Sequence, residues 1–118
     1  MDKQQALHSF WSSFQIPAYD ETSVPDSASL PYITYEVTTG DIGTQLPISA
    51  SVWYRSSSWQ AITEKCNEIE RAITRGGRMV NYDNGAFWIR WRNAHRMEEP
   101  TDDMVRRVLI NGSIEFMD

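Results

Sequence analysis

The chain has 118 residues, 41% hydrophobic and 12% aromatic, and a formal net charge of −5. This composition excludes intrinsic disorder and low complexity, and the length fits one domain, residues 1–118, with a single core. The single cysteine, Cys66, excludes an internal disulfide, and no apolar run reaches the roughly 20 residues of a membrane span. Because no charged and apolar leader opens the chain, we expect it to work in a reducing cytoplasm.

Two helices are predicted from apolar residues at helical spacing. The first ends near Gln15, since Pro17 disfavours helical angles in the residue before it, and its stripe is Leu7, Phe10, Trp11 and Phe14. The second stripe is Trp59, Ile62, Cys66, Ile69 and Ile73. Ser57 with Gln60 matches a capping box at its start, and Gly76 and Gly77 supply its stop.

Between the helices, residues 15–31 have no period and are predicted to form an extended connector. Alternating residues in 31–39 and 47–55 predict two strands joined as a hairpin by the glycine-containing loop 40–47. The three serines at 56–58 raise the question of a nucleophile. Such a site would need flanking glycines and a histidine base, so the turn is interpreted as a joint between strand and helix.

After the second helix, residues 78–91 predict another hairpin around Asp83-Asn84-Gly85, with Trp88 and Arg90 on the face opposite its apolar residues. The closing run, 104–116, alternates as a strand does, and its apolar face contains Met104, Val108, Ile110, Ile114 and Phe116. Gly112 suggests a bulge in this strand. The order helix-strand-strand-helix-strand-strand-strand predicts an α+β fold: a mostly antiparallel sheet of about five strands with its helices on one face.

The sequence offers weak signals for metal binding and for nucleic-acid binding, and none for catalysis. The segment 92–103 is predicted to be a charged loop, and its one histidine with scattered carboxylates does not match the spacing of a metal site. Aromatic residues interleave with Arg90, Arg92 and Arg96, as in single-stranded nucleic-acid modules, although the chain is acidic, with a pI near 4.9. No motif indicates an enzyme, and no cofactor or metal is expected.

The distribution of charge suggests self-association. Residues 1–54 carry one base and six acids, whereas residues 55–118 carry ten of each, and nine of the eleven bases are arginines. Such a chain could pair head to tail with copies of itself, although a merely solvated acidic face fits the charges equally well.

Several stretches resemble one protein family. They are the connector Ile16-Pro17-x-Tyr19-x-Glu21 with Leu30-Pro31-Tyr32-Ile33-Thr34-Tyr35 after it, and Asp102-Asp103-Met104 to Arg106-Arg107 before the last strand. The pattern, from Phe10 to Phe116, is similar to that of the small tail-terminator or tail-completion proteins of long-tailed bacteriophages.

The resemblance implies a structural protein of the virion, located in the neck region of the tail and assembled in the cytoplasm of the host bacterium. Its members form a ring, typically a homo-hexamer, that caps the head-proximal end of the tail tube, ends tail polymerisation and joins the head. The implied partners are other copies of the chain, the tail tube protein and the head–tail connector or head-completion protein. Neither a membrane nor specific nucleic-acid recognition is expected. Two alternatives to this function stay open. The first is a head-completion or neck connector protein of the same virion, and the second, less favoured, is a single-stranded nucleic-acid-binding module.

In a ring, the acidic half of one copy would face the arginines of the next. The candidate interface residues are Asp20, Glu21, Asp26, Asp41, Arg55, Arg90, Arg92 and Arg96. The candidate docking loop contains His95, Glu98, Glu99, Asp102 and Asp103. Deletion of residues 94–101 is expected to leave a folded monomer that no longer docks.

Overall fold

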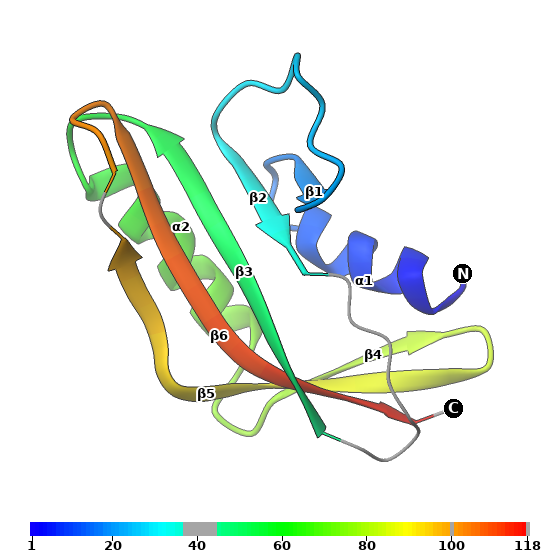
Figure 1. The fold of residues 1–118 in the computed structure, drawn as a ribbon. Coiled ribbons are helices and arrows are strands. Elements are labelled where there is room, and N and C mark those ends of the chain that lie inside the picture. Colours follow the sequence, from blue (N-terminus) through cyan, green and yellow to red (C-terminus); the bar gives the residue numbers. More distant parts are fainter. Residues whose placement is uncertain (37–44, 100, 118) are drawn as a thin grey trace.

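The protein folds as a single six-stranded sheet with two helices (Figure 1). The computed structural model describes residues 1–36, 45–99 and 101–117, without the side chains of residues 93 and 94. The helices are α1 (Lys3–Ser12) and α2 (Gln60–Ala72). The strands are β1 (Ala18–Asp20), β2 (Tyr32–Tyr35), β3 (Gln45–Arg55), β4 (Arg78–Tyr82), β5 (Gly85–Glu99) and β6 (Val105–Met117). The predicted α+β class is confirmed, with one more strand than expected.

The strands lie in the order β1-β2-β3-β6-β5-β4, and every neighbouring pair is antiparallel except β1 with β2. The extra strand, β1, lies inside the segment 15–31 that was predicted to be an irregular connector. The backbone N–H of Ile33 donates to the Pro17 carbonyl at 2.8 Å, and that of Glu21 donates to the Tyr35 carbonyl at 2.9 Å. A strand of three residues is too short to show a period, so only its pairing reveals it.

Both helices cover the same face of the sheet and share one core with it. The apolar stripes predicted for the two helices are buried, apart from the half-buried Trp59. They meet the inward residues of the central strands, chiefly Ile48, Ala50 and Val52 of β3, Phe87 and Ile89 of β5, and Val108, Ile110, Ile114 and Phe116 of β6. The predicted alternation is therefore confirmed in all three strands. Met104 is an exception, because it precedes β6 and is 53% exposed.

The two helices begin differently from one another. In α1, the Asp2 carboxylate accepts from the Gln5 backbone N–H and the Gln5 side chain accepts from the Asp2 backbone N–H, which is a capping box. The capping box predicted for α2 is wrong, since Trp59 is its N-cap and makes no side-chain cap bond. Instead, the Ser58 hydroxyl accepts from the Gln60 N–H at 3.1 Å, in a turn that precedes the helix.

The loop predicted at 92–103 is also wrong, because β5 continues to Glu99. Trp91 pairs with Gly112 and Arg96 with Ile110, so that four residues of β5 lie opposite one residue of β6 in a bulge. The bulge predicted at Gly112 is thus on the neighbouring strand, while β3 and β6 pair in continuous register across Gly112. The strand continues through a polar sequence because β6 offers it a complete backbone edge to pair with.

Neither helix in the described part of the chain is long and apolar enough to cross a membrane.

Candidate functional site

The side of the sheet opposite the helices has no described helix packed on it. Figure 1 shows α2 behind β3 and β6. Since side chains alternate along a strand, the residues between the core positions point to this other side. We call it the uncovered face. Its larger or charged members are Tyr19, Tyr32, Trp53, Trp88, Arg90, Arg92, Met97, Glu99, Arg107 and Glu115.

A row of aromatic and charged side chains crosses one end of the uncovered face. Tyr32 pairs with Trp53, Trp53 with Arg107, and Arg107 with Glu99, on four adjacent strands. The Tyr19 ring lies 5.6 Å from that of Tyr32, edge to face, and the Tyr32 ring lies 6.5 Å from that of Trp53. The Arg107 guanidinium stacks over Trp53 at 4.7 Å. We call these five residues the aromatic row.

Hydrogen bonds hold Trp53 and Arg107, the two central residues of the aromatic row, in place. The Trp53 indole N–H donates to the Thr34 hydroxyl at 2.9 Å, and Arg107 Nε donates to the Ser51 hydroxyl at 3.1 Å. Both hydroxyl residues are buried, Thr34 at 9% and Ser51 at 4% exposure. The row is therefore a preorganised surface, which loses little side-chain entropy when a partner covers it.

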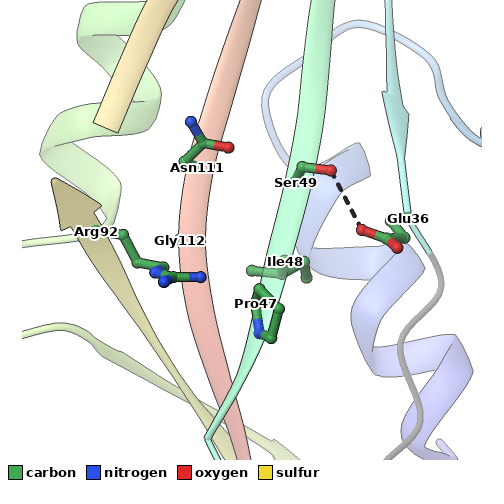
Figure 2. A pocket seen from close by; sticks show the side chains of 7 residues that line it. All are labelled: Glu36, Pro47, Ile48, Ser49, Arg92, Asn111 and Gly112. Atoms are coloured by element: carbon green, nitrogen blue, oxygen red, sulfur yellow. Dashed lines mark hydrogen bonds between the residues drawn. The ribbon is translucent and has the colours of Figure 1, made fainter. Parts of the chain in front are cut away.

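An open cavity of about 610 Å³ lies beside the bulge of β5 (Figure 2). Its lining residues are Glu36, Pro47, Ile48, Ser49, Arg92, Asn111 and Gly112. Arg92 reaches toward β6 from one side, while Glu36 lies on the other side and accepts from the Ser49 hydroxyl at 3.2 Å. Arg92 forms no ion pair with any described residue. The cavity thus presents one positive and one negative group, and a serine hydroxyl bound to the negative group, with no histidine among its lining residues.

The predicted cationic residues separate into different environments. Arg90 is exposed on the uncovered face and stacks on Trp88 at 5.5 Å. Arg55 is exposed at the end of β3. Arg96 lies on the helix side, where it donates to Asn67 at 2.8 Å and to Glu70 at 3.0 Å. The structure therefore brings Arg90 and Arg92 onto one face, while Arg96 has partners within its own chain.

The predicted acidic residues gather at one end of the sheet. Glu21 and Asp26 are exposed in the segment between β1 and β2. Asp20 ends β1, and its carboxylate accepts from the N–H and the hydroxyl of Thr22, at 3.0 Å and 2.9 Å. Asp41 lies outside the described residues.

The predicted docking loop is not a loop over most of its length. His95, Glu98 and Glu99 are part of β5, and Asp102 and Asp103 lie in the short connection to β6. His95 Nε2 lies 2.8 Å from Glu70 Oε1, on the side that packs against α2. Deletion of 94–101 would remove four cross-strand pairs, Arg96 to Glu99, so it cannot separate docking from folding. Strand pairing that is set by β6 left no signal in the sequence of this segment.

One serine and histidine pair was missed by sequence reasoning. His8 Nε2 lies 3.2 Å from the Ser12 hydroxyl, and His8 Nδ1 lies 2.9 Å from the Tyr35 hydroxyl. Burial raises the pKa of Tyr35, the nearby Asp20 carboxylate adding to the effect, so its phenol stays neutral and supplies no negative charge to a histidinium. Ser12 lies inside α1, whose N–H groups there are bonded within the helix, so an oxyanion would find no donors. The i, i+4 spacing was the available signal, and the trio is interpreted as a structural contact.

Comparison with known proteins gives no relative. No family model matches the chain, and neither a curated protein nor a solved structure matches it.

Neither a metal site nor a reactive cysteine is found in the described part of the chain. No group of three histidine, cysteine or acidic side chains lies close enough to hold a metal ion among the described residues. Cys66 is 1% exposed, and burial raises the pKa of its thiol to about 11. A neutral, buried thiol is a poor nucleophile. The uncovered face, with its aromatic row, is the strongest candidate for a functional surface.

Proposed function

We propose that this protein is a structural subunit of a long-tailed bacteriophage. It caps the head-proximal end of the tail tube as a ring of identical copies, ends tail polymerisation and provides the surface that joins the head. The ring contains six copies, and its partners are the tail tube protein and the head–tail connector or head-completion protein. The assembled ring lies in the neck region of the virion.

The observation that carries this proposal is the uncovered face with its aromatic row. Trp, Tyr and Arg are the residues that contribute most to binding at protein interfaces, and here Tyr32, Trp53 and Arg107 stand side by side on adjacent strands. One hydrogen bond each fixes the orientation of Trp53 and of Arg107. Such a surface suits a protein partner with a large flat contact area. The sequence resemblance supplies the identity of the partners.

Tail assembly in vitro tests whether the protein caps the tail tube and whether the aromatic row is needed for it. Purified protein is added to polymerising tail tube protein of the same phage, and tube lengths and end-bound density are measured by electron microscopy. The wild type is expected to bind one end and to stop elongation. The double variant W53A/R107A is expected to lose end binding, while Gln4→Ala, an exposed change on α1, keeps it. Tubes that grow to the same length with and without the wild-type protein would exclude the terminator role.

The head-completion or neck connector role differs in its partner, because such a protein would bind the head portal and leave tube elongation unchanged. A single-stranded nucleic-acid module is the third candidate, and the stacking of Arg107 on Trp53 is the observation that favours it. Glu99, Glu36 and Glu115 on or beside the same face oppose phosphate binding. Fluorescence anisotropy with an oligothymidylate distinguishes the nucleic-acid module from the two structural roles. A nucleic-acid module binds the oligonucleotide tightly at low salt and loses affinity as the salt concentration rises.

A further inference from the structure

Three exposed arginines lie where α2 connects to β4, and one of them, Arg78, stacks over the Phe10 ring at 5.5 Å. Arg71 is exposed in the last turn of α2, Arg75 is exposed in the connection, and Arg78 is exposed at the start of β4. Among the described residues, none of the three forms an ion pair with a carboxylate. From residue 71 to residue 82 the chain carries no acidic residue. We call Arg71, Arg75 and Arg78 the basic turn.

The strand that follows the basic turn is an edge of the sheet. β4 is hydrogen-bonded to β5 on one side, and no described strand pairs with its other side. Met79, on this strand, is 47% exposed. A free edge with an exposed apolar side chain is a place where another polypeptide can lie. The basic turn therefore borders a surface that suits a polypeptide better than a small anion.

The complementary charges lie at the other end of the molecule. The acidic connector, by which we mean Asp20 at the end of β1 and the segment from there to β2, carries Asp20, Glu21 and Asp26. Residues 4–54 contain no lysine or arginine to neutralise it. Turns hold it in shape, with the Ser23 N–H donating to the Asp20 carbonyl at 2.9 Å and the Ala28 N–H donating to the Pro25 carbonyl at 3.0 Å. In Figure 1 the connector is at the top and the basic turn at the bottom of the molecule.

Two complementary patches at opposite ends cannot meet within one chain, but they can meet between copies. We propose that the basic turn of one copy binds the acidic connector of the next copy, in a head-to-tail contact along the free edge of β4. The inference rests on the proposed ring of copies and names the contact that builds it. It replaces Arg55, Arg90, Arg92 and Arg96 as the cationic side and leaves the aromatic row available to other proteins. A contact of this kind is heterologous and closes into a ring when the rotation per copy divides a full turn.

A charge-swap experiment tests the contact. The variant R71E/R75E has two negative patches, and the variant E21R/D26R has two positive ones. Each variant alone is expected to associate roughly 100-fold more weakly than the wild type, because like charges then face each other. In an equimolar mixture every contact is complementary again, so copies alternate and association returns to the wild-type strength. Sedimentation velocity across a concentration series, at low and high salt, measures the association of the wild type, of each variant and of the mixture. Added salt is expected to weaken the association of the wild type.

The variant R55E/R92E serves as the matched control. It makes the same change in net charge, at two exposed arginines outside the basic turn, and is expected to associate like the wild type. Recovery in the mixture also shows that both charge-swap variants fold. The contact is refuted if R55E/R92E associates weakly while R71E/R75E does not, or if the mixture fails to recover.

The test is separate from that of the proposed function. A wild type that stays monomeric at every concentration and salt would overturn the contact, whereas tube capping is scored independently. Recovery in the mixture together with unaltered tube growth would support the contact and reject the terminator role.

Discussion

Gly112 lies where the backbone of β5 comes close to β6, and adding one methyl group there should destabilise the protein. A Cβ at Gly112 would lie 2.6 Å from the Arg90 carbonyl oxygen and 3.5 Å from Ile48 Cγ2. The Arg90 oxygen belongs to the backbone of β5, which pairs with β6 on both sides of this point, so it cannot turn aside as a side chain could. The strand has to shift by several tenths of an ångström.

Overpacking of this kind costs about 1–3 kcal/mol in the free energy of unfolding. For a chain of this length, each kcal/mol lowers Tm by roughly 3–6 °C. The variant Gly112→Ala is therefore expected to unfold at a lower urea concentration, with an unchanged dependence on urea, when tryptophan fluorescence is followed.

Gly76→Ala is the control for this prediction. A Cβ at Gly76 meets nothing within 4 Å, and the residue is not in the left-handed region. We expect it to be neutral or up to about 1 kcal/mol more stable, because alanine restricts the unfolded chain. If the two alanine variants had equal stability within roughly 0.5 kcal/mol, the close approach of β5 to Gly112 would be wrong.

Three further predictions follow from single side chains. The Cys66 thiol should react with a thiol reagent at pH 8 only after denaturation. Because its pKa rises from 9.0 to about 11 on folding, its contribution to the free energy of unfolding is complete below pH 9 and is lost as the pH rises toward 11. The variant Cys66→Ala should lack this loss. Glu70→Gln removes an ion pair with Arg96 and a contact with His95, all partly exposed, and should cost about 0.5–1 kcal/mol in urea denaturation, less in high salt; a loss above 3 kcal/mol would contradict it. Trp53→Phe keeps an aromatic ring but loses the indole N–H bond to a buried hydroxyl, and thermal unfolding should show a loss of roughly 1–3 kcal/mol, whereas an unchanged Tm would show that the bond contributes nothing.

Local periodicity was sufficient to predict most elements. The buried stripe of α1, that of α2 and the alternation along β3, β5 and β6 were all visible in the sequence, because one-sided burial imposes the period of the element on the apolar residues. The hairpin turn at Asp83-Asn84 was visible too, because turn-forming residues separate two alternating runs, although no residue of the turn has a positive φ angle.

Pairing between distant segments was not predictable in the same way. β1 is too short to show a period, and the continuation of β5 through residues 96–99 depends on the backbone of β6. A capping box was predicted for Ser57 and Gln60 from spacing alone, yet the chain direction at Trp59 gave the serine hydroxyls other N–H groups to accept from. These features are set by geometry rather than by residue type.

The sequence by itself determined that this chain has two amphipathic helices on one face of a mostly antiparallel sheet, and an uneven distribution of acids and arginines. Only the tertiary structure decided which arginines are free, since Arg96 is bound to α2 whereas Arg71 and Arg75 have no carboxylate partner among the described residues. It also placed Tyr32, Trp53 and Arg107 in one row across adjacent strands. Register and pairing place residues that are distant in sequence side by side, and no local pattern contains that information.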